Sequence, residues 1–226
     1  MPSPAELNAR LRVGALELFE AKGFDATTAE DIATAAGISR RTFFRYFPVR
    51  EDVLFSDHAV YLLLVEERLS SASGEPIRVA GESLLPVLEG LVTDASFVAR
   101  RAALARDNVP LRDREVLWMR EYQELLAAHL ARQDLGGRSA IFAQIVAAAV
   151  LAAFSQVIVR WLESPATEDP RALFAELLDE IAESMGESGI RGRGPGPEHP
   201  ERPGVVVINS GLSAEQIAHL IEGARP

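Results

Sequence analysis

The chain of 226 residues contains no cysteine, which excludes disulfide bonds, thiolate zinc sites, iron–sulfur clusters and a cysteine nucleophile. Histidine is scarce, and none of the four histidines has a second histidine at metal-binding spacing: His58, His129, His199 and His219. A Gly-rich phosphate loop, a Gly-x-Ser-x-Gly elbow and a His-Glu-x-x-His motif are all missing from the sequence. We therefore expect no metal site, no cofactor and no enzymatic activity.

The N-terminus has no basic segment followed by an apolar one, so a signal peptide is not expected and the sequence predicts a cytoplasmic protein. Residues 140–159 are nearly all apolar and long enough to suggest a membrane span. Alanines and two glutamines, Gln144 and Gln156, lower the hydropathy of this run. We therefore expect a buried or interface helix of a soluble protein and no membrane partner.

Charge is unevenly distributed along the chain, whose formal net charge is −10. Such a charge argues against a nucleic-acid partner at first, because nucleic acids prefer basic surfaces. Residues 1–50, however, carry seven basic and six acidic side chains. Four of these basic side chains lie within 40–50, where there is no acid. The sequence indicates a small basic head on an acidic body.

The first 48 residues have the pattern of three helices that form a helix-turn-helix domain. Apolar residues recur at helical spacing before Gly23, where a first helix is expected to end. Thr28 and Asp31 have the spacing of a capping box that begins a second helix. Ser39 is a suitable N-cap for a third helix over 40–47, which Pro48 closes.

The remainder is predicted to be all-α, so that an N-terminal three-helix helix-turn-helix domain (1–48) is followed by a C-terminal helical domain (49–186). The apolar pattern predicts the following helices: 50–69, 76–92, 95–106, 110–133, 140–159 and a last one near 171–185. An apolar helix beside an amphipathic one at the end of this domain favours a dimer interface near 140–162 and 171–185. A Gly/Pro-rich linker (187–204) then precedes a short strand-helix extension (205–226).

The most specific feature is the segment Ser39-Arg40-Arg41-Thr42-Phe43-Phe44-Arg45-Tyr46-Phe47. At about 100° per residue, Arg40, Arg41, Phe44 and Arg45 share an arc of roughly 140°. Phe43 and Phe47 lie on the other side, where they can pack on the first two helices. Arginine offers paired donors for guanine edges and phosphates, so this face suits a helix that enters the major groove.

At these positions the sequence resembles the TetR/AcrR family of transcriptional regulators. The resemblance covers about the first 55 residues and rests on the following segments: Leu18-Phe19, Gly23-Phe24, Thr27-Thr28, Asp31-Ile32-Ala33, Ala36-Gly37-Ile38-Ser39, Thr42 to Pro48, Glu51 and Leu54. The rest of the chain is compatible in length and apolar pattern. The resemblance implies a ligand-responsive repressor that binds a palindromic operator as a homodimer, with no membrane partner.

The resemblance also implies roles for individual residues of the head. The implied DNA contacts are Thr28, Ser39, Arg40, Arg41, Thr42, Phe44, Arg45, Tyr46 and Arg50. Phe44 replaces the usual tyrosine, which removes a phosphate hydrogen bond, and Tyr46 replaces the more usual histidine. Arg50 stands where a lysine commonly opens the fourth helix beside the duplex backbone.

An unidentified small-molecule effector is implied for a pocket within the body. The candidate lining residues are Phe97, Trp118, Met119, Tyr122, Phe142, Gln144 and Gln156. The two glutamines are candidates because a buried amide needs a partner, which a ligand, water or the dimer mate can supply. The acidic body disfavours a strongly anionic effector unless Arg100, Arg101 or Arg160 points inward.

Two other functions remain open on the sequence alone. One is a helical protein-binding adaptor or scaffold that uses the C-terminal extension. The other is a helical enzyme whose site combines residues distant in sequence. The acid-free arginine face disfavours the adaptor, and the absence of any nucleophile–base or metal-ligand spacing disfavours the enzyme.

Overall fold

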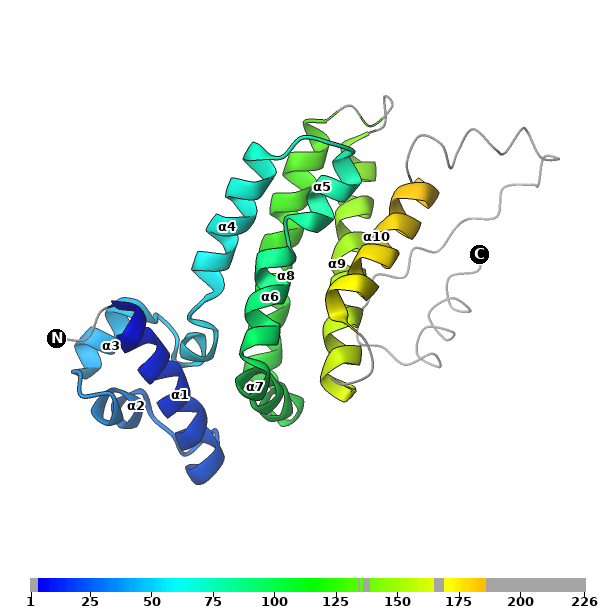
Figure 1. Ribbon diagram of the computed structural model, residues 1–226. Helices are drawn as coiled ribbons and strands as arrows, with labels where there is room; N and C mark the ends of the chain where they lie inside the picture. Colours follow the sequence, from blue (N-terminus) through cyan, green and yellow to red (C-terminus); the bar gives the residue numbers. More distant parts are fainter. Residues whose placement is uncertain (1–3, 134, 136–138, 165–168, 186–226) are drawn as a thin grey trace, which may run out of the picture. The chain divides into compact units, whose positions relative to one another are not determined.

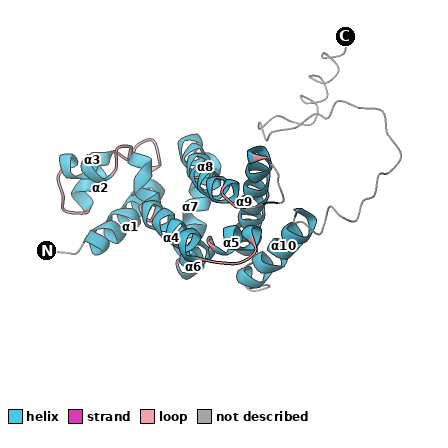
Figure 2. Cartoon of the chain, turned by 90° about the horizontal axis from the view of Figure 1, so that it is seen from above, coloured by secondary structure: helices cyan, strands magenta, loops and turns pink. Residues whose placement is uncertain are grey.

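The computed structural model describes residues 4–133, 135, 139–164 and 169–185, and this part of the chain is helical (Figures 1 and 2). Its elements are α1 (Pro4–Lys22), α2 (Ala29–Ala35), α3 (Arg40–Tyr46), the 3₁₀ helix η1 (Arg50–Phe55), α4 (His58–Ser71), α5 (Pro76–Glu82), α6 (Leu85–Thr93), α7 (Ala95–Asp107), α8 (Val109–Ala131), α9 (Ala140–Glu163) and α10 (Pro170–Met185). The predicted all-α fold is confirmed for these residues. The predicted linker and the strand-helix extension lie outside them.

Residues 4–55, called the head below, form the helix-turn-helix unit. α1 ends where Gly23 adopts φ +91°, and the turn between α2 and α3 uses Gly37 at φ +72°. Both values lie in the left-handed region that glycine tolerates without strain. Phe19, Ile32 and Phe43, one from each helix, are almost fully buried together.

The residues from 58 to 185, called the body below, surround a second hydrophobic core. α9 packs between α8 and α10, while α5 contacts α8, α9 and α10 (Figure 1). α5 can come close to α10 because it carries Gly81, where a methyl group would overlap the Leu178 side chain. The core of the head continues into the body at Phe97, Ala105 and Leu111.

The prediction of one helix over 50–69 is wrong, because the structure divides this segment into η1 and α4. Val53, Leu54 and Phe55 are consecutive and all buried, which one face of an α-helix cannot provide. The turn that follows is held by α1, since Asn8 donates from Nδ2 to the Ser56 carbonyl at 3.2 Å. Contacts from α1 therefore delay the start of α4 to His58.

The prediction of one helix over 76–92 is also wrong, because α5 ends at Glu82 and α6 starts at Leu85. Pro86 occupies the first turn of α6 and has no backbone N–H. A continuous helix would place the proline ring against the Glu82 carbonyl four residues earlier. The chain therefore breaks before the proline.

Within the described residues, α9 is the helix long and apolar enough to cross a membrane, with a mean hydropathy of 2.1 over its most apolar window. One face of α9 is buried against α8 and α10, including Ala147, Val150 and Val157. The opposite face is exposed and mostly apolar, with Ile141, Ile145 and Val159 at 72%, 51% and 47% exposure, and it also carries the exposed Gln144 and Gln156.

Candidate functional site

Hydrogen bonds at the starts of α2 and α3 fix the two helices of the helix-turn-helix. Thr28 donates its backbone N–H to Asp31 Oδ2 at 2.8 Å, and Thr28 Oγ1 accepts from the Asp31 N–H at 3.1 Å. Lys22 pairs with the same carboxylate at 2.9 Å, so hydrogen bonds from Lys22 and Thr28 lower the pKa of Asp31. Ser39 Oγ accepts from the Thr42 N–H at 3.1 Å. The predicted capping box is thus present.

α3 is anchored from behind by aromatic rings. Phe43 is fully buried and Phe47 nearly so, and their ring centroids lie 5.3 Å apart. Phe44 meets the Phe43 ring edge-on at 5.5 Å but stays 38% exposed. This packing fixes the rotation of α3 about its own axis, which decides the side chains that point outward.

The outward face of α3 carries three arginines, Arg40, Arg41 and Arg45, all exposed. The Arg40 guanidinium lies 5.5 Å from the Phe44 ring centroid, and that of Arg45 lies 5.2 Å from the Tyr46 ring centroid. Across the described residues, no carboxylate is paired with any of the three. These guanidinium groups are therefore available to a partner of negative charge.

The structure places Arg50 differently from the expectation of a DNA-facing side chain. Its guanidinium donates to the carbonyls of Phe24, at 3.1 Å, and of Thr27, and it pairs with Glu51 at 2.8 Å. It also lies over the rings of Phe19 and Phe24, at 5.3 and 4.4 Å from their centroids. Arg50 therefore stabilises the interior of the head and is not a free cation on its surface.

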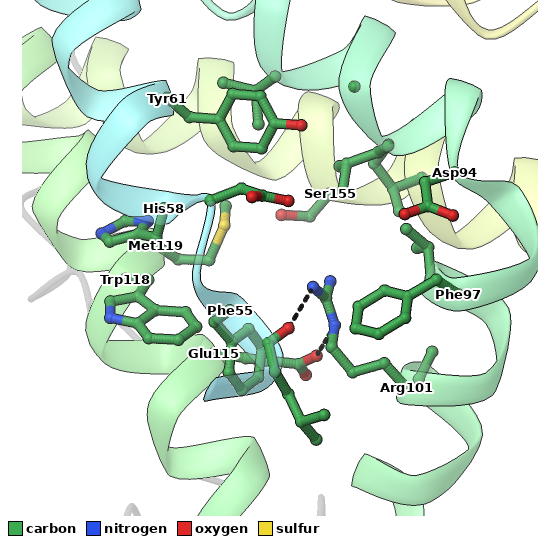
Figure 3. Close-up of a pocket in the computed structure, with 18 of the residues that line it drawn as sticks. Phe55, His58, Tyr61, Asp94, Phe97, Arg101, Glu115, Trp118, Met119 and Ser155 are labelled. Carbon is green, nitrogen blue, oxygen red and sulfur yellow. Dashed lines mark hydrogen bonds and ion pairs between the residues drawn. The ribbon is translucent and has the colours of Figure 1, made fainter. Parts of the chain in front are cut away.

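A cavity of about 300 Å³ is lined by residues of both the head and the body, from α1, η1, α4, α6, α7, α8 and α9 (Figure 3). Four of the predicted lining residues are present: Phe97, Trp118, Met119 and Tyr122. The other three do not line it. Phe142 packs against the core of the body, while Gln144 and Gln156 are exposed on α9 and do not line the cavity.

The rim of the cavity includes charged groups that the sequence analysis did not assign. Arg12 of α1 pairs with Asp57, at 2.5 Å, and with Asp94, so one side chain of the head holds residues that flank α4 and α7. Its guanidinium also lies 4.6 Å from the Phe97 ring centroid. Arg12 therefore connects the head directly to the cavity.

Aromatic residues make one wall of the cavity. Phe55 meets Trp118 edge-on with centroids 3.9 Å apart, and His58 stacks on the same indole at 4.8 Å. His58 Nε2 lies 2.8 Å from Glu121 Oε2, which links α4 to α8. Burial raises the pKa of Tyr61, whose hydroxyl end lies against Gly90 of α6. No group of residues in the described part of the chain has the arrangement of a metal site.

A helix-turn-helix head with an arginine face, joined to a helical body with a cavity, defines a DNA-binding regulator. A family model described as bacterial regulatory proteins of the tetR family matches residues 11–56, and a model of the MftR C-terminal domain matches residues 76–188. The chain belongs to the TetR family and is a DNA-binding transcriptional regulator. The adaptor alternative finds no support among these matches.

Individual relatives agree with this assignment. MftR of Mycobacterium tuberculosis, described as a mycofactocin biosynthesis transcriptional regulator, is 27% identical over 71% of this chain and 82% of its own length. The HTH-type transcriptional regulator TcmR of Streptomyces glaucescens is 32% identical over 59% of this chain and 56% of its own.

Solved structures share the fold. Thermus thermophilus FadR, a TetR family repressor in complex with lauroyl-CoA, has a TM-score of 0.51 at 24% identity, covering 86% of this chain and all of its own. NalD of Pseudomonas aeruginosa, the secondary repressor of an efflux pump, has a TM-score of 0.54 at 21% identity, covering 82% of this chain and 98% of its own.

Proposed function

We propose that this protein is a cytoplasmic repressor that binds a palindromic operator on the nucleoid as a homodimer and leaves it when a small molecule fills the cavity. The observation that carries the proposal is the geometry of α3: its three arginines are exposed, and the buried rings of Phe43 and Phe47 anchor the helix that carries them. A helix of this kind reaches base edges through guanidinium donors, and neighbouring hydroxyls and amides hold the phosphates. On this proposal Arg40, Arg41 and Arg45 read the major groove.

The caps of α2 and α3 suit the phosphate contacts. Thr28 and Ser39 are exposed at the helix starts, and Thr42 lies beside Ser39 with 2.8 Å between the two hydroxyl oxygens. Tyr46, at 48% exposure, and Phe44 lie on the rim of the arginine face. We assign the three hydroxyl residues and Tyr46 to the phosphate backbone, and Phe44 to a thymine methyl or a sugar.

A homodimer supplies the second reading helix that a palindromic operator requires. The exposed face of α9 suits this contact because it continues along the helix as apolar and small residues: Ile141, Ile145, Ala148, Ala152 and Val159. The exposed side of α10 adjoins it, since the two helices pack together. We assign these two faces to the dimer interface.

Arg12 gives the cavity a route to the head. A molecule in the cavity contacts α4 and α7. Asp57 lies just before α4 and Asp94 just before α7, and both carboxylates pair with Arg12 of α1. A change in the spacing of these elements therefore moves α1, and with it the separation of the two reading helices. A ligand releases DNA to the extent that it binds this second arrangement more tightly.

The DNA-binding part of the proposal is tested with duplexes selected by the protein from random sequence. Arg41→Ala and Arg45→Ala should each weaken binding by roughly 5- to 100-fold, since a good base contact contributes about 1–3 kcal/mol. Both should leave the free energy of unfolding within about 0.5 kcal/mol, because the two side chains are exposed. The matched control is Arg120→Ala on α8, whose side chain is 73% exposed. Unchanged affinity in both variants would overturn the assigned reading face.

The coupling role of Arg12 can be tested by pulsed electron resonance, because a chain without cysteine accepts a single spin label. With Ala35→Cys labelled in both heads of the dimer, Arg12→Gln should broaden the distribution of distances between the labels. The reason is that α1 loses its two carboxylate ties to the body. Arg120→Gln in the same background should leave the distribution unchanged. A narrow distribution in the Arg12 variant would show that other contacts orient the head.

A further inference from the structure

Arg101 is a charged group of the cavity whose hydrogen-bonding capacity is largely unused. It extends from α7 into the cavity, beside the Phe97 ring (Figure 3). Nη1 donates to the Leu54 carbonyl at 3.4 Å, and the guanidinium lies 4.6 Å from the Phe55 ring centroid. Among the described residues, the Arg101 Nε–H has no hydrogen-bond acceptor. The nearest carboxylate oxygen, on Glu115, lies 4.0 Å from Nε, which is too far for a hydrogen bond. A guanidinium has five N–H donors, so most of them remain open to a ligand.

The other charges at the cavity have closer partners. Arg12 holds both Asp57 and Asp94, and His58 lies 2.8 Å from Glu121. Arg101 and Glu115 neutralise each other poorly. Burial lowers the pKa of the Arg101 guanidinium and raises the pKa of the Glu115 carboxyl, so each ion lacks the stabilisation that water or a close partner would give it. An arginine stays charged at neutral pH, which makes Arg101 the position where an added anion gains most.

The rest of the cavity suits an apolar body. Its walls include Phe97, Trp118, Met119, Phe154, Ile158 and Leu162. A volume of about 300 Å³ is at the lower end of the range for small-molecule sites. Three carboxylates at the cavity, Asp57, Asp94 and Glu115, disfavour a ligand that carries two or more negative charges.

We propose that the cavity binds a molecule with an apolar body and a single carboxylate, and that this carboxylate pairs with Arg101 in place of Glu115. The two oxygens of a carboxylate match the parallel donors of a guanidinium fork. The inference rests on the proposed function, in which this cavity is the effector site. An anionic effector in an acidic body requires an arginine that points into the cavity, and Arg101 is such an arginine.

The test compares three probes that share a ten-carbon chain and differ only in the head group: decanoate, decan-1-ol and decylamine. Their binding to the full-length protein is measured by titration calorimetry at pH 7. Decanoate should bind at least about tenfold more tightly than the alcohol, because a charge-assisted pair is added. Decylamine should bind more weakly than either. Equal binding of decanoate and decanol, or tightest binding of decylamine, would overturn the head-group assignment while leaving the cavity as a ligand site.

Two variants with opposite expected effects separate pairing from folding. Arg101→Met keeps the apolar stem and should weaken decanoate about tenfold or more, with decanol changed by less than threefold. Glu115→Gln removes the competing carboxylate and should strengthen decanoate binding several-fold. The matched control is Arg100→Met, because the neighbouring Arg100 pairs with Glu20 and does not line the cavity. Unchanged decanoate affinity in both the Arg101 and the Glu115 variants contradicts the proposal. If none of the probes binds, both the carboxylate proposal and the assignment of this cavity as the effector site are refuted. The operator experiment then still tests DNA binding independently.

Discussion

At the scale of single residues, two arginines of the head divide between its interior and its surface. Arg50 is tied to backbone carbonyls and aromatic rings inside the head, whereas Arg45 is exposed on α3. Arg50→Ala should therefore lower the free energy of unfolding by about 1.5–3 kcal/mol, since it removes charge-assisted hydrogen bonds to the Phe24 and Thr27 carbonyls. Denaturant titration measures this loss.

For operator affinity, the Arg50 and Arg45 variants should differ in the opposite sense. Where the Arg50→Ala protein is still folded, its operator affinity should stay within a few-fold, whereas Arg45→Ala should lose affinity at nearly unchanged stability. An Arg50→Ala protein of normal stability that no longer binds the operator would instead support the phosphate contact that the family resemblance implies.

Two charged residues of the cavity, Arg12 and Arg101, share the helical spacing of buried apolar residues in the sequence. Arg12 has the helical spacing of the buried Leu16 and Phe19, and Arg101 that of the buried Phe97 and Ala105. A charge on an apolar stripe is either paired or placed for a ligand. The sequence could not tell which, because the partners of Arg12 are 45 and 82 positions away.

At the scale of elements, local signals predicted the first three helices, and the two wrong helix boundaries have different causes. The caps at Thr28 and Ser39 and the glycines at 23 and 37 act on their own neighbours, so the sequence was sufficient there. The start of α4 depends on Asn8 and Arg12 of α1, which no local pattern reveals. Pro86, in contrast, was a visible local signal for the break before α6.

The contact between α4 and α6 gives a prediction about two glycines. A methyl group at Gly90 would overlap the Tyr61 hydroxyl and ring, so Gly90→Ala should destabilise the protein by about 1–3 kcal/mol. Gly14 in α1 has open space around it, so Gly14→Ala should stabilise by roughly 0.5–1 kcal/mol through helix propensity alone. Urea unfolding of the two variants measures both effects. A Gly90 variant as stable as the Gly14 variant would mean that the Tyr61 ring moves aside at no cost.

At the scale of the whole molecule, the proposed operator binding by a homodimer brings together two copies of a head that alone would touch few base pairs. Residues 1–50 carry a charge of only +1, while the remaining 176 residues carry −11. The acidic body repels DNA, so the positive charge on one α3 has to overcome the electrostatic repulsion from the rest of the same chain. Joining two heads makes the second contact intramolecular and raises its effective concentration.

This dependence leads to a prediction at the proposed dimer face. Ile145→Glu puts a charge in the middle of the exposed apolar face of α9, where Ile145 is 51% exposed, and should convert the dimer into a monomer. The control is Val116→Glu on α8, a residue that is 67% exposed outside that face and should leave the dimer intact. Sedimentation equilibrium measures the mass of each variant, and operator affinity should fall at least about tenfold in the Ile145 variant alone. A dimeric Ile145→Glu protein, or a monomer that keeps full affinity for the palindrome, would show that the heads are paired through another surface.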